Sequence, residues 1–250
     1  MATGSTDTSI KLFEVAKVRQ MPMPDASGRD GPLRPVIRTF YDHMQPINDL
    51  DFHPWSAVLI SGAKDHTIKF FDIARTGTRR AHRVIQDTHN VRSVAFHPSG
   101  DFILAGTDHH IAHLYDVHTF QCYLSSTSQE RDAGGATNQV RYSSNVSMYV
   151  TASENGGARI WDGVSAQYTR AIIGAQHTQI RCQAVFNQTE QFVLSIDEPS
   201  KEVIIWDTLT GDIVARWPSN HSGVPRWLEH SPTESNFCAD RSVRFWRESL

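Results

Sequence analysis

Residues 61–72, SGAKDHTIKFFD, combine a short apolar stretch, a polar turn and a second stretch in which apolar and polar residues alternate. This order is typical of two β-strands joined by a tight turn. The chain repeats the pattern six times, at residues 2–14, 61–72, 105–116, 151–162, 195–207 and 238–248. Because an internal repeat of this kind organises the whole chain, it decides the fold.

An aromatic residue near the end of each repeat gives the period. These residues are Phe13, Phe71, Tyr115, Trp161, Trp206 and Trp246. Their spacings are 58, 44, 46, 45 and 40 residues, and most of them lie near the roughly 40–45 residues of a four-stranded propeller blade. Alternating stretches such as INDLDFHP (47–54) and VRYSSN (140–145) precede the hairpins and predict inner strands. We therefore predict an all-β, WD40-type β-propeller with six recognisable repeats in a single domain over residues 1–250.

Two features depart from a regular ring. The stretch 16–35 is rich in Pro, Gly and mixed charge, so we expect a long loop, which explains the 58-residue spacing. The first repeat is incomplete, because no inner strand precedes Ala2, and the last repeat ends close to Trp246. Propeller rings close by pairing strands from the two chain ends. We therefore expect incomplete closure, with truncation favoured over an unusual closure.

Composition narrows the class of function. The net charge is -3, so the chain lacks the overall basic field that drives non-specific nucleic-acid binding. No apolar run approaches the roughly 20 residues of a membrane span, and the N-terminus has no signal-peptide pattern. We expect a soluble intracellular protein. Cys122, Cys182 and Cys238 are odd in number and widely spaced, which favours small buried hydrophobes in a reducing compartment over a disulfide framework.

Polar residues recur at fixed places in the repeats. In well-formed repeats a His, a Ser or Thr, an Asp and a Trp share hydrogen bonds that satisfy buried polar groups. The residues in these places are His43, Ser61 and Asp65 in the second repeat, and Thr151, Asn155 and Trp161 in the fourth. The second network is only partial, because Phe71 has no ring N–H. Ser, His and Asp also form hydrolase triads, but the repeat explains all three, so we predict no catalytic residue and no enzyme.

Two other clusters have ordinary explanations. His109, His110 and His113 form the densest histidine group, but no Cys, Asp or Glu at a recognised metal-ligand spacing accompanies them, so we expect no metal and no cofactor. The run RTGTRRAHR (75–83) is basic and suited to phosphate or an acidic peptide. It lacks interleaved aromatic residues that stack bases, so a solvated loop is favoured.

The face of the propeller is the predicted binding surface. Residues at the start of inner strands and just before the turn Asp are expected to face the central opening. Charged side chains around a rigid mouth suit recognition of an extended peptide. The candidates for partner contact are Asn48, Lys64, Asn90, Arg92, Glu154 and Arg181.

Longer strings go beyond a generic repeat. They resemble the WD-repeat subunits of cleavage stimulation factor, the complex of pre-mRNA 3′-end cleavage and polyadenylation. The resemblance extends with gaps from Ala2 to about Trp246 and includes the loop at 16–35. The strings are PVIRTFYDH (35–43), FHPSGDFILAGTDH (96–109), LYDVHTFQCYLS (114–125), MYVTASENGGARIWDGVS (148–165) and QAVFNQTEQFVLSIDE (183–198).

This resemblance implies a non-enzymatic scaffold in the nucleus. It implies docking to the larger helical-repeat subunit of the same complex, and contacts with other 3′-end processing or transcription proteins. Family members carry an N-terminal self-association region and seven blades. This sequence lacks that region and about one blade before residues 180–187, so self-association is not expected. The alternatives are an adaptor of another complex and a propeller that contacts RNA through Arg92, Arg181 and residues 75–83.

Overall fold

Every regular element of the chain is a β-strand within the residues that the computed structural model describes. These residues are 1–14, 36–124, 135–154, 157–163, 165, 168–177, 183–221, 223–225, 227–230, 236–238 and 246–247. The predicted loop at 16–35, together with Asn155, Arg181 and Cys182, lies outside them. The described part holds no helix long and apolar enough to span a membrane.

The strands form six antiparallel sheets, which we number as blades 1 to 6 in chain order. Blade 1 has β1 (Ala2–Gly4), β2 (Ser9–Phe13) and β3 (Val36–Tyr41). Blade 2 has β4 (Ile47–Phe52), β5 (Val58–Ala63), β6 (Thr67–Asp72) and β7 (Arg83–Gln86). Blade 3 has β8 (Val91–Phe96), β9 (Phe102–Thr107), β10 (His113–Asp116) and β11 (Cys122–Leu124).

The remaining blades follow the same antiparallel order. Blade 4 has β12 (Thr137–Tyr142), β13 (Met148–Ser153), β14 (Ala158–Asp162) and β15 (Tyr168–Ile172). Blade 5 has β16 (Ala184–Phe186), β17 (Phe192–Ile196), β18 (Glu202–Asp207) and β19 (Ile213–Pro218). Blade 6 has β20 (Glu229–His230), β21 (Asn236–Cys238) and β22 (Trp246–Arg247).

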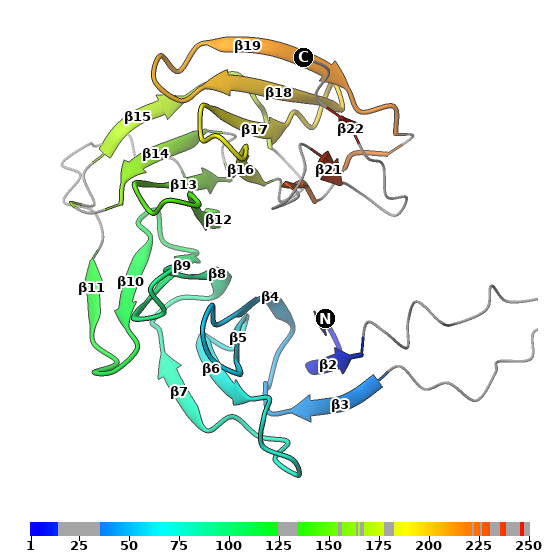
Figure 1. Cartoon of the computed structure of the whole chain (residues 1–250), viewed down its shortest axis with the longest axis vertical. Helices are drawn as coiled ribbons and strands as arrows, with labels where there is room; N and C mark the ends of the chain where they lie inside the picture. Colours follow the sequence, from blue (N-terminus) through cyan, green and yellow to red (C-terminus); the bar gives the residue numbers. More distant parts are fainter. Residues whose placement is uncertain are drawn as a thin grey trace, which may run out of the picture.

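The blades follow one another around a common centre (Figure 1). The first strand of each four-stranded blade lies nearest the centre, and the fourth lies on the outer rim. Blade 1 has three strands, and its hairpin β1–β2 corresponds to the middle hairpin of the complete blades. The arrangement confirms the predicted WD40-type β-propeller with six repeats and an incomplete first one.

Each of the inner strands β4, β8 and β12 carries a bulge at its second residue. The pairing with the next strand shifts between Ile47 and Asp49, between Val91 and Ser93, and between Thr137 and Gln139. The sequence pattern predicted the third of these strands within 140–145, and its start was wrong by three residues, because β12 already begins at Thr137. β4 and β8 begin with the apolar Ile47 and Val91, whereas β12 begins with the polar residues Thr137, Asn138 and Gln139, so no alternation of apolar and polar residues marks its start.

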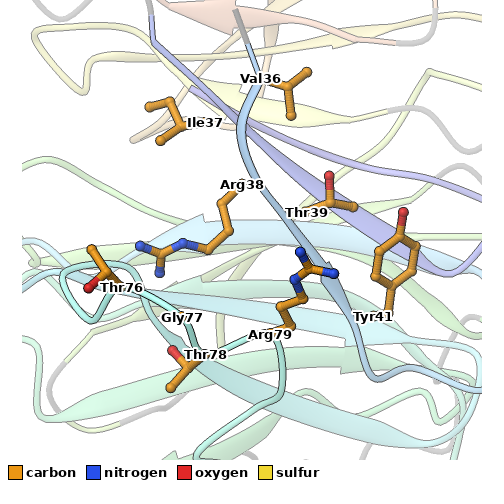
Figure 2. A pocket seen from close by; sticks show the side chains of 9 residues that line it. All are labelled: Val36, Ile37, Arg38, Thr39, Tyr41, Thr76, Gly77, Thr78 and Arg79. Carbon is orange, nitrogen blue, oxygen red and sulfur yellow. The ribbon is translucent and has the colours of Figure 1, made fainter.

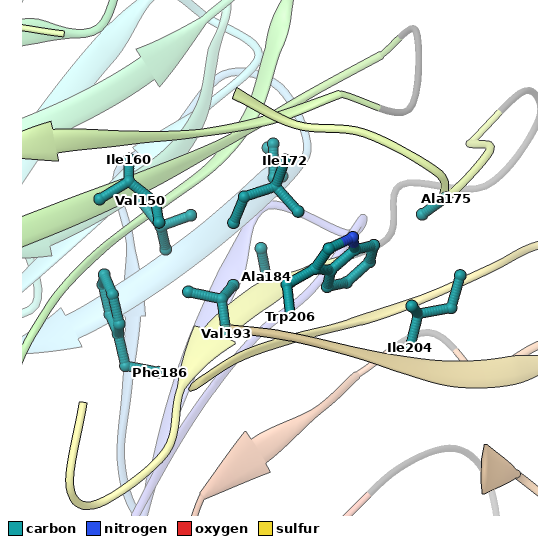
Figure 3. Packing of buried hydrophobic residues seen from close by; sticks show 11 residues of the cluster. Val150, Ile160, Ile172, Ala175, Ala184, Phe186, Val193, Ile204 and Trp206 are labelled. Carbon is teal, nitrogen blue, oxygen red and sulfur yellow. The ribbon is translucent and has the colours of Figure 1, made fainter. Parts of the chain in front are cut away.

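The hydrophobic core lies between neighbouring blades. One cluster joins Ile160 and Ile172 of blade 4 to Val193, Ile204 and Trp206 of blade 5, and Figure 3 shows these side chains meeting between the two sheets. The indole of Trp206 is 1% exposed. Since a blade buries its apolar faces only against its neighbours, neighbouring blades stabilise each other, as in other repeat proteins.

Cys122 departs from the expectation of a buried cysteine. It is a free, exposed thiol at the start of β11. The reason is the position of β11, which is the outer strand of blade 3 and has a neighbouring strand on one edge only. Of the other two cysteines, Cys182 lies outside the described residues.

Candidate protein-interaction site

Hydrogen bonds between successive inner strands hold the centre of the propeller together. In each case a side chain at or directly before an inner strand accepts a backbone N–H of the next blade. Asp49, Ser93 and Gln139 are third in their strands, Gln183 directly precedes β16, and successive acceptors are 44 to 46 residues apart. The bonds run from Val94 N to Asp49 Oδ2 (3.1 Å), Val140 N to Ser93 Oγ (3.3 Å), Ala184 N to Gln139 Oε1 (2.7 Å) and Leu228 N to Gln183 Oε1 (3.3 Å). The inner strands of blades 2 to 6 therefore form a cross-linked frame.

The bulge residues of this frame lie next to the turns of the neighbouring blade. Asn48 Nδ2 donates to Asn90 Oδ1 at 3.0 Å and to the carbonyl oxygen of Val91 at 2.6 Å. Asn90 Nδ2 in turn donates to Asp108 Oδ1 at 3.4 Å. Two of the predicted contact residues, Asn48 and Asn90, therefore contact each other across the boundary between blades 2 and 3.

Arg92, the bulge residue of β8, continues this polar chain into blade 4. Its Nε donates to Asp108 Oδ1, and its Nη1 donates to Asn138 Oδ1 at 2.6 Å. The same Nη1 lies 3.6 Å from Glu154 Oε1. The Arg92 side chain is only 13% exposed, while the Glu154 side chain is 52% exposed. The guanidinium is thus neutralised by carboxylates, and the acidic partners are the groups that face solvent.

Lys64, Asp108 and Glu154 occupy the same place in blades 2, 3 and 4. The backbone N–H of each donates to a carbonyl just before the inner strand of its own blade, at 2.9, 3.1 and 2.9 Å respectively. Asp108 and Asn138 were not among the contact residues predicted from the sequence. Aligning the repeats position by position would have found both, because Asp108 matches Lys64 and Asn138 matches Asn48. We call Asn48, Lys64, Asn90, Arg92, Asp108, Asn138 and Glu154 the mouth residues.

Behind the mouth, blade 2 contains the network expected from the sequence. His43 Nδ1 lies 2.8 Å from Asp65 Oδ2, and His43 Nε2 lies 2.5 Å from Ser61 Oγ. Burial lowers the pKa of His43 against the pull of the Asp65 carboxylate. Burial favours a higher pKa for Asp65, but hydrogen bonds from Thr67, Met44 and His43 outweigh it and lower that pKa. Ser61 is 0% exposed, so its hydroxyl has no access to a substrate.

Blade 3 contains a network with the acid and the base exchanged. Asp87 stands six residues before Ser93, as His43 stands six before Asp49. Its Oδ2 accepts hydrogen bonds from His113 Nδ1 at 2.8 Å and from the hydroxyl of Tyr115. Burial favours a higher pKa for Asp87, but the two donors outweigh it and lower the pKa. Sequence reasoning missed this network because it searched for a histidine in that position.

Blades 4 and 5 hold shorter versions. Trp161 Nε1 donates to Thr151 Oγ1 at 3.0 Å in blade 4, while the predicted third member, Asn155, lies outside the described residues. In blade 5 His177 takes the position of His43, six residues before Gln183. Its Nε2 lies 2.7 Å from the carbonyl oxygen of Ile196. The contact in blade 5 ties the loop to β17, whereas the contact in blade 4 joins β13 to β14, and both tasks are structural.

The dense histidine group is divided between two roles. His113 belongs to the buried network of blade 3, whereas the rings of His109 and His110 lie 4.3 Å apart at the adjoining turn. Burial, together with repulsion from the neighbouring histidines, lowers the pKa of His109. Among the residues that the structure describes, no group of three or more His, Cys, Asp or Glu is placed to hold a metal ion.

Comparison with known proteins identifies the repeat and the family. The model of the WD domain, G-beta repeat, matches residues 34–72 and 76–116. The nuclear distribution protein nudF of Aspergillus niger is 28% identical over 71% of this chain and 36% of its own length. The guanine nucleotide-binding protein subunit beta of Zea mays is 24% identical over 64% of this chain and 39% of its own length.

A much stronger match is cleavage stimulation factor subunit 50 of Arabidopsis thaliana. It is 52% identical over 296 aligned positions that include 100% of this chain and 68% of the relative. The alignment is 46 positions longer than this chain of 250 residues, which is close to the length of one blade. The identity and the coverage together place this chain, with its WD repeats, in the family of cleavage stimulation factor subunit 50.

Proposed function

We propose that residues 1–250 act as a single WD-repeat domain that serves as a non-enzymatic scaffold in mRNA 3′-end cleavage and polyadenylation in the nucleus. The observation that carries this proposal is the 52% identity to cleavage stimulation factor subunit 50 over the whole chain. The same family membership favours the larger helical-repeat subunit of cleavage stimulation factor as the main partner. Other 3′-end processing or transcription proteins are further partners of the same kind.

The mouth residues are the proposed contact surface. Asn48, Arg92 and Asn138 stand on inner strands that are joined to one another by hydrogen bonds, while Lys64, Asp108 and Glu154 directly follow the second strands of their blades. A partner would therefore meet a preorganised surface and lose little free energy to ordering it. The exposed charges are of both signs, with the basic Lys64 in blade 2 and the acidic Asp108 and Glu154 in blades 3 and 4. A partner with complementary charges would be selected and oriented by such a pattern. Arg181, the sixth predicted contact residue, belongs to the same proposal.

Binding is tested by capture of the purified larger subunit on the immobilised chain. Lys64→Glu reverses an exposed charge at the mouth and should weaken capture about tenfold, as for one lost charge pair. Lys11→Glu on β2 makes the same change of net charge away from the mouth, so it should leave capture unchanged. Thermal unfolding of each variant checks the fold. Equal capture by all three proteins would contradict the mouth as contact surface, and no capture by a cooperatively folded chain would contradict the partner.

Direct RNA contact is the competing explanation, and the surroundings of Arg92 argue against it. Its guanidinium already contacts Asp108, Asn138 and Glu154, so a phosphate would have to displace existing partners. Affinity that depends on phosphate contacts falls steeply as salt rises. Measurable affinity for a single-stranded RNA, with such a salt dependence and with loss in Arg92→Gln, would replace the scaffold proposal.

A further inference from the structure

A groove on the outer rim has no part in the mouth. It lies between β3 of blade 1 and residues 76–79 of the loop between β6 and β7, and its volume is about 550 Å³ (Figure 2). The loop belongs to the basic run 75–83, which the proposed function leaves unused. The two walls come from different blades, so the groove exists only in the folded propeller.

Two arginines face this groove from opposite walls, Arg38 from β3 and Arg79 from the loop (Figure 2). Arg38 Nη1 donates to the carbonyl oxygen of Asp72 at 3.2 Å, and its guanidinium lies 5.5 Å from the ring centre of Phe40. These contacts hold it in place without neutralising it. In the described part of the chain neither arginine forms an ion pair with a carboxylate. The groove therefore offers two guanidinium groups to an anion.

Apolar side chains stand beside these charges. Ile37 is 56% exposed and Tyr41 is 57% exposed, and both line the groove. A free inorganic anion would make no use of this apolar surface. A peptide with an acidic side chain next to an apolar one would satisfy both parts of the wall, because guanidinium groups bind carboxylate or phosphate while apolar surface is removed from water.

The backbone of β3 adds a third element of recognition. The backbone N–H of Tyr41 donates to the carbonyl oxygen of Arg79 at 3.1 Å, so the backbone N–H of Tyr41 points away from β2. Alternate residues of a strand direct their backbone N–H and C=O groups to the same side, so these groups of Thr39 also point away from β2. The described residues provide no partner for its backbone groups. An extended peptide pairs with such an open strand edge.

We propose that this groove binds an extended acidic segment of a partner protein. An anionic side chain would lie between Arg38 and Arg79, and an apolar side chain would rest on Ile37 and Tyr41. Among the described residues Tyr41 is the only aromatic one that lines the groove, so these residues do not provide the successive stacking platforms that single-stranded RNA uses. The inference rests on the groove alone and does not depend on the proposed function.

Fluorescence anisotropy with the full chain tests the charge requirement. The probes are a short labelled peptide of alternating Glu and Val, the same peptide with Gln for Glu, the same peptide with phosphoserine for Glu, and an oligouridine RNA. At least one anionic peptide should bind about tenfold or more tightly than the Gln peptide, because charge-assisted pairs are lost in the latter. The tighter of the two anionic peptides identifies carboxylate or phosphate as the preferred group.

Arg79→Glu should weaken binding of the anionic peptide about tenfold or more, whereas Arg80→Glu should weaken it by less than about threefold. Arg80 is an exposed neighbour that does not line the groove, so the pair of variants separates a local contact from overall charge. Thr39→Pro removes the outward N–H and should weaken binding about fivefold, since an edge strand tolerates proline.

Three results would overturn the proposal. They are equal losses in Arg79→Glu and Arg80→Glu, failure of both anionic peptides to bind a chain that unfolds cooperatively, and RNA binding that is lost in Arg79→Glu. Unchanged affinity in Thr39→Pro, with an unchanged melting temperature, would refute pairing with the strand edge.

Discussion

Blades 2 and 3 perform the same structural task with opposite chemistry. In blade 2 a buried histidine, His43, stands in the loop before the inner strand and contacts Ser61 and Asp65. In blade 3 a buried carboxylate, Asp87, stands in the corresponding place and accepts from His113 and Tyr115. Ala105 takes the position of Ser61, so no hydroxyl is available there, and the donors come from β10 instead.

The comparison shows what each blade requires. The loop before the inner strand must be tied to the strands behind it by buried hydrogen bonds, because unpaired polar groups in that position are costly. Which residue donates and which accepts is free to vary. A search for one residue type therefore finds some blades and misses others, whereas a search by position finds His43, Asp87 and His177 in blades 2, 3 and 5.

The largest expected effect is the loss of the carboxylate in blade 3. Asp87→Ala leaves the buried side chains of His113 and Tyr115 without their shared acceptor. We expect the free energy of unfolding to fall by about 3 kcal/mol, because two buried donors lose their hydrogen bonds to a charged acceptor. Urea unfolding measures it. Asp101→Ala on the surface of the same blade is the control and should not move the midpoint, and an equally small effect of Asp87→Ala would contradict the proposed importance of this network.

Removing the histidine of blade 2 should cost less. His43→Ala leaves Ser61 and Asp65 unpaired on one side, but Asp65 keeps its bonds to Thr67 and to the backbone of Met44. We expect a loss of about 2 kcal/mol in the free energy of unfolding. Ser61→Ala should cost about 1 kcal/mol, and the double variant should cost less than the sum. If the losses of the two single variants add up to the loss of the double variant, the two side chains do not interact.

The boundary between the two blades should depend on pH. Burial raises the pKa of Asp51 to about 6, although its Oδ2 accepts the backbone N–H of Phe96 at 2.7 Å. The folded chain then holds this proton more tightly than the unfolded chain, so its contribution to stability falls as pH rises from about 4 to about 6. Asp51→Asn cannot titrate. As pH rises across that interval, the free energy of unfolding of Asp51→Asn should therefore increase by about 1 to 2 kcal/mol relative to that of wild type. A difference between the two proteins that does not change with pH would contradict the raised pKa.

The smallest effect concerns the turn after the inner strand. Gly100 in blade 3 and Val146 in blade 4 occupy the same position and both have a positive φ, of 85° and 66°. A β-branched residue is strained there, whereas glycine is not. Val146→Gly should raise stability by about 0.5 kcal/mol, the relief of strain less the flexibility that glycine adds to the unfolded chain. A lower melting temperature of Val146→Gly would show that packing of the Val146 side chain contributes more to stability than its backbone strain costs.

Much of the fold could be predicted from the sequence, and less of the site. The spacing of Phe71, Tyr115 and Trp161 indicates the blades, because each blade must present an aromatic residue to the same part of the core. The network of His43, Ser61 and Asp65 follows from that repeat. The start of β12 could not be predicted, since its first three residues are all polar and show no alternation. The exposure of Cys122 depends on its place in an outer strand.

The sequence by itself determined the number of repeats, their order and the strands within each, because these depend on periodicity over neighbouring residues. Only the tertiary structure decided which side chains meet. Asn48 contacts Asn90, and Arg92 reaches Asn138, across more than 40 residues of chain. The rim groove likewise joins β3 to a loop of the next blade. Such contacts depend on how the blades are turned around the centre, and that geometry follows from the packing between blades and leaves no local pattern in the sequence.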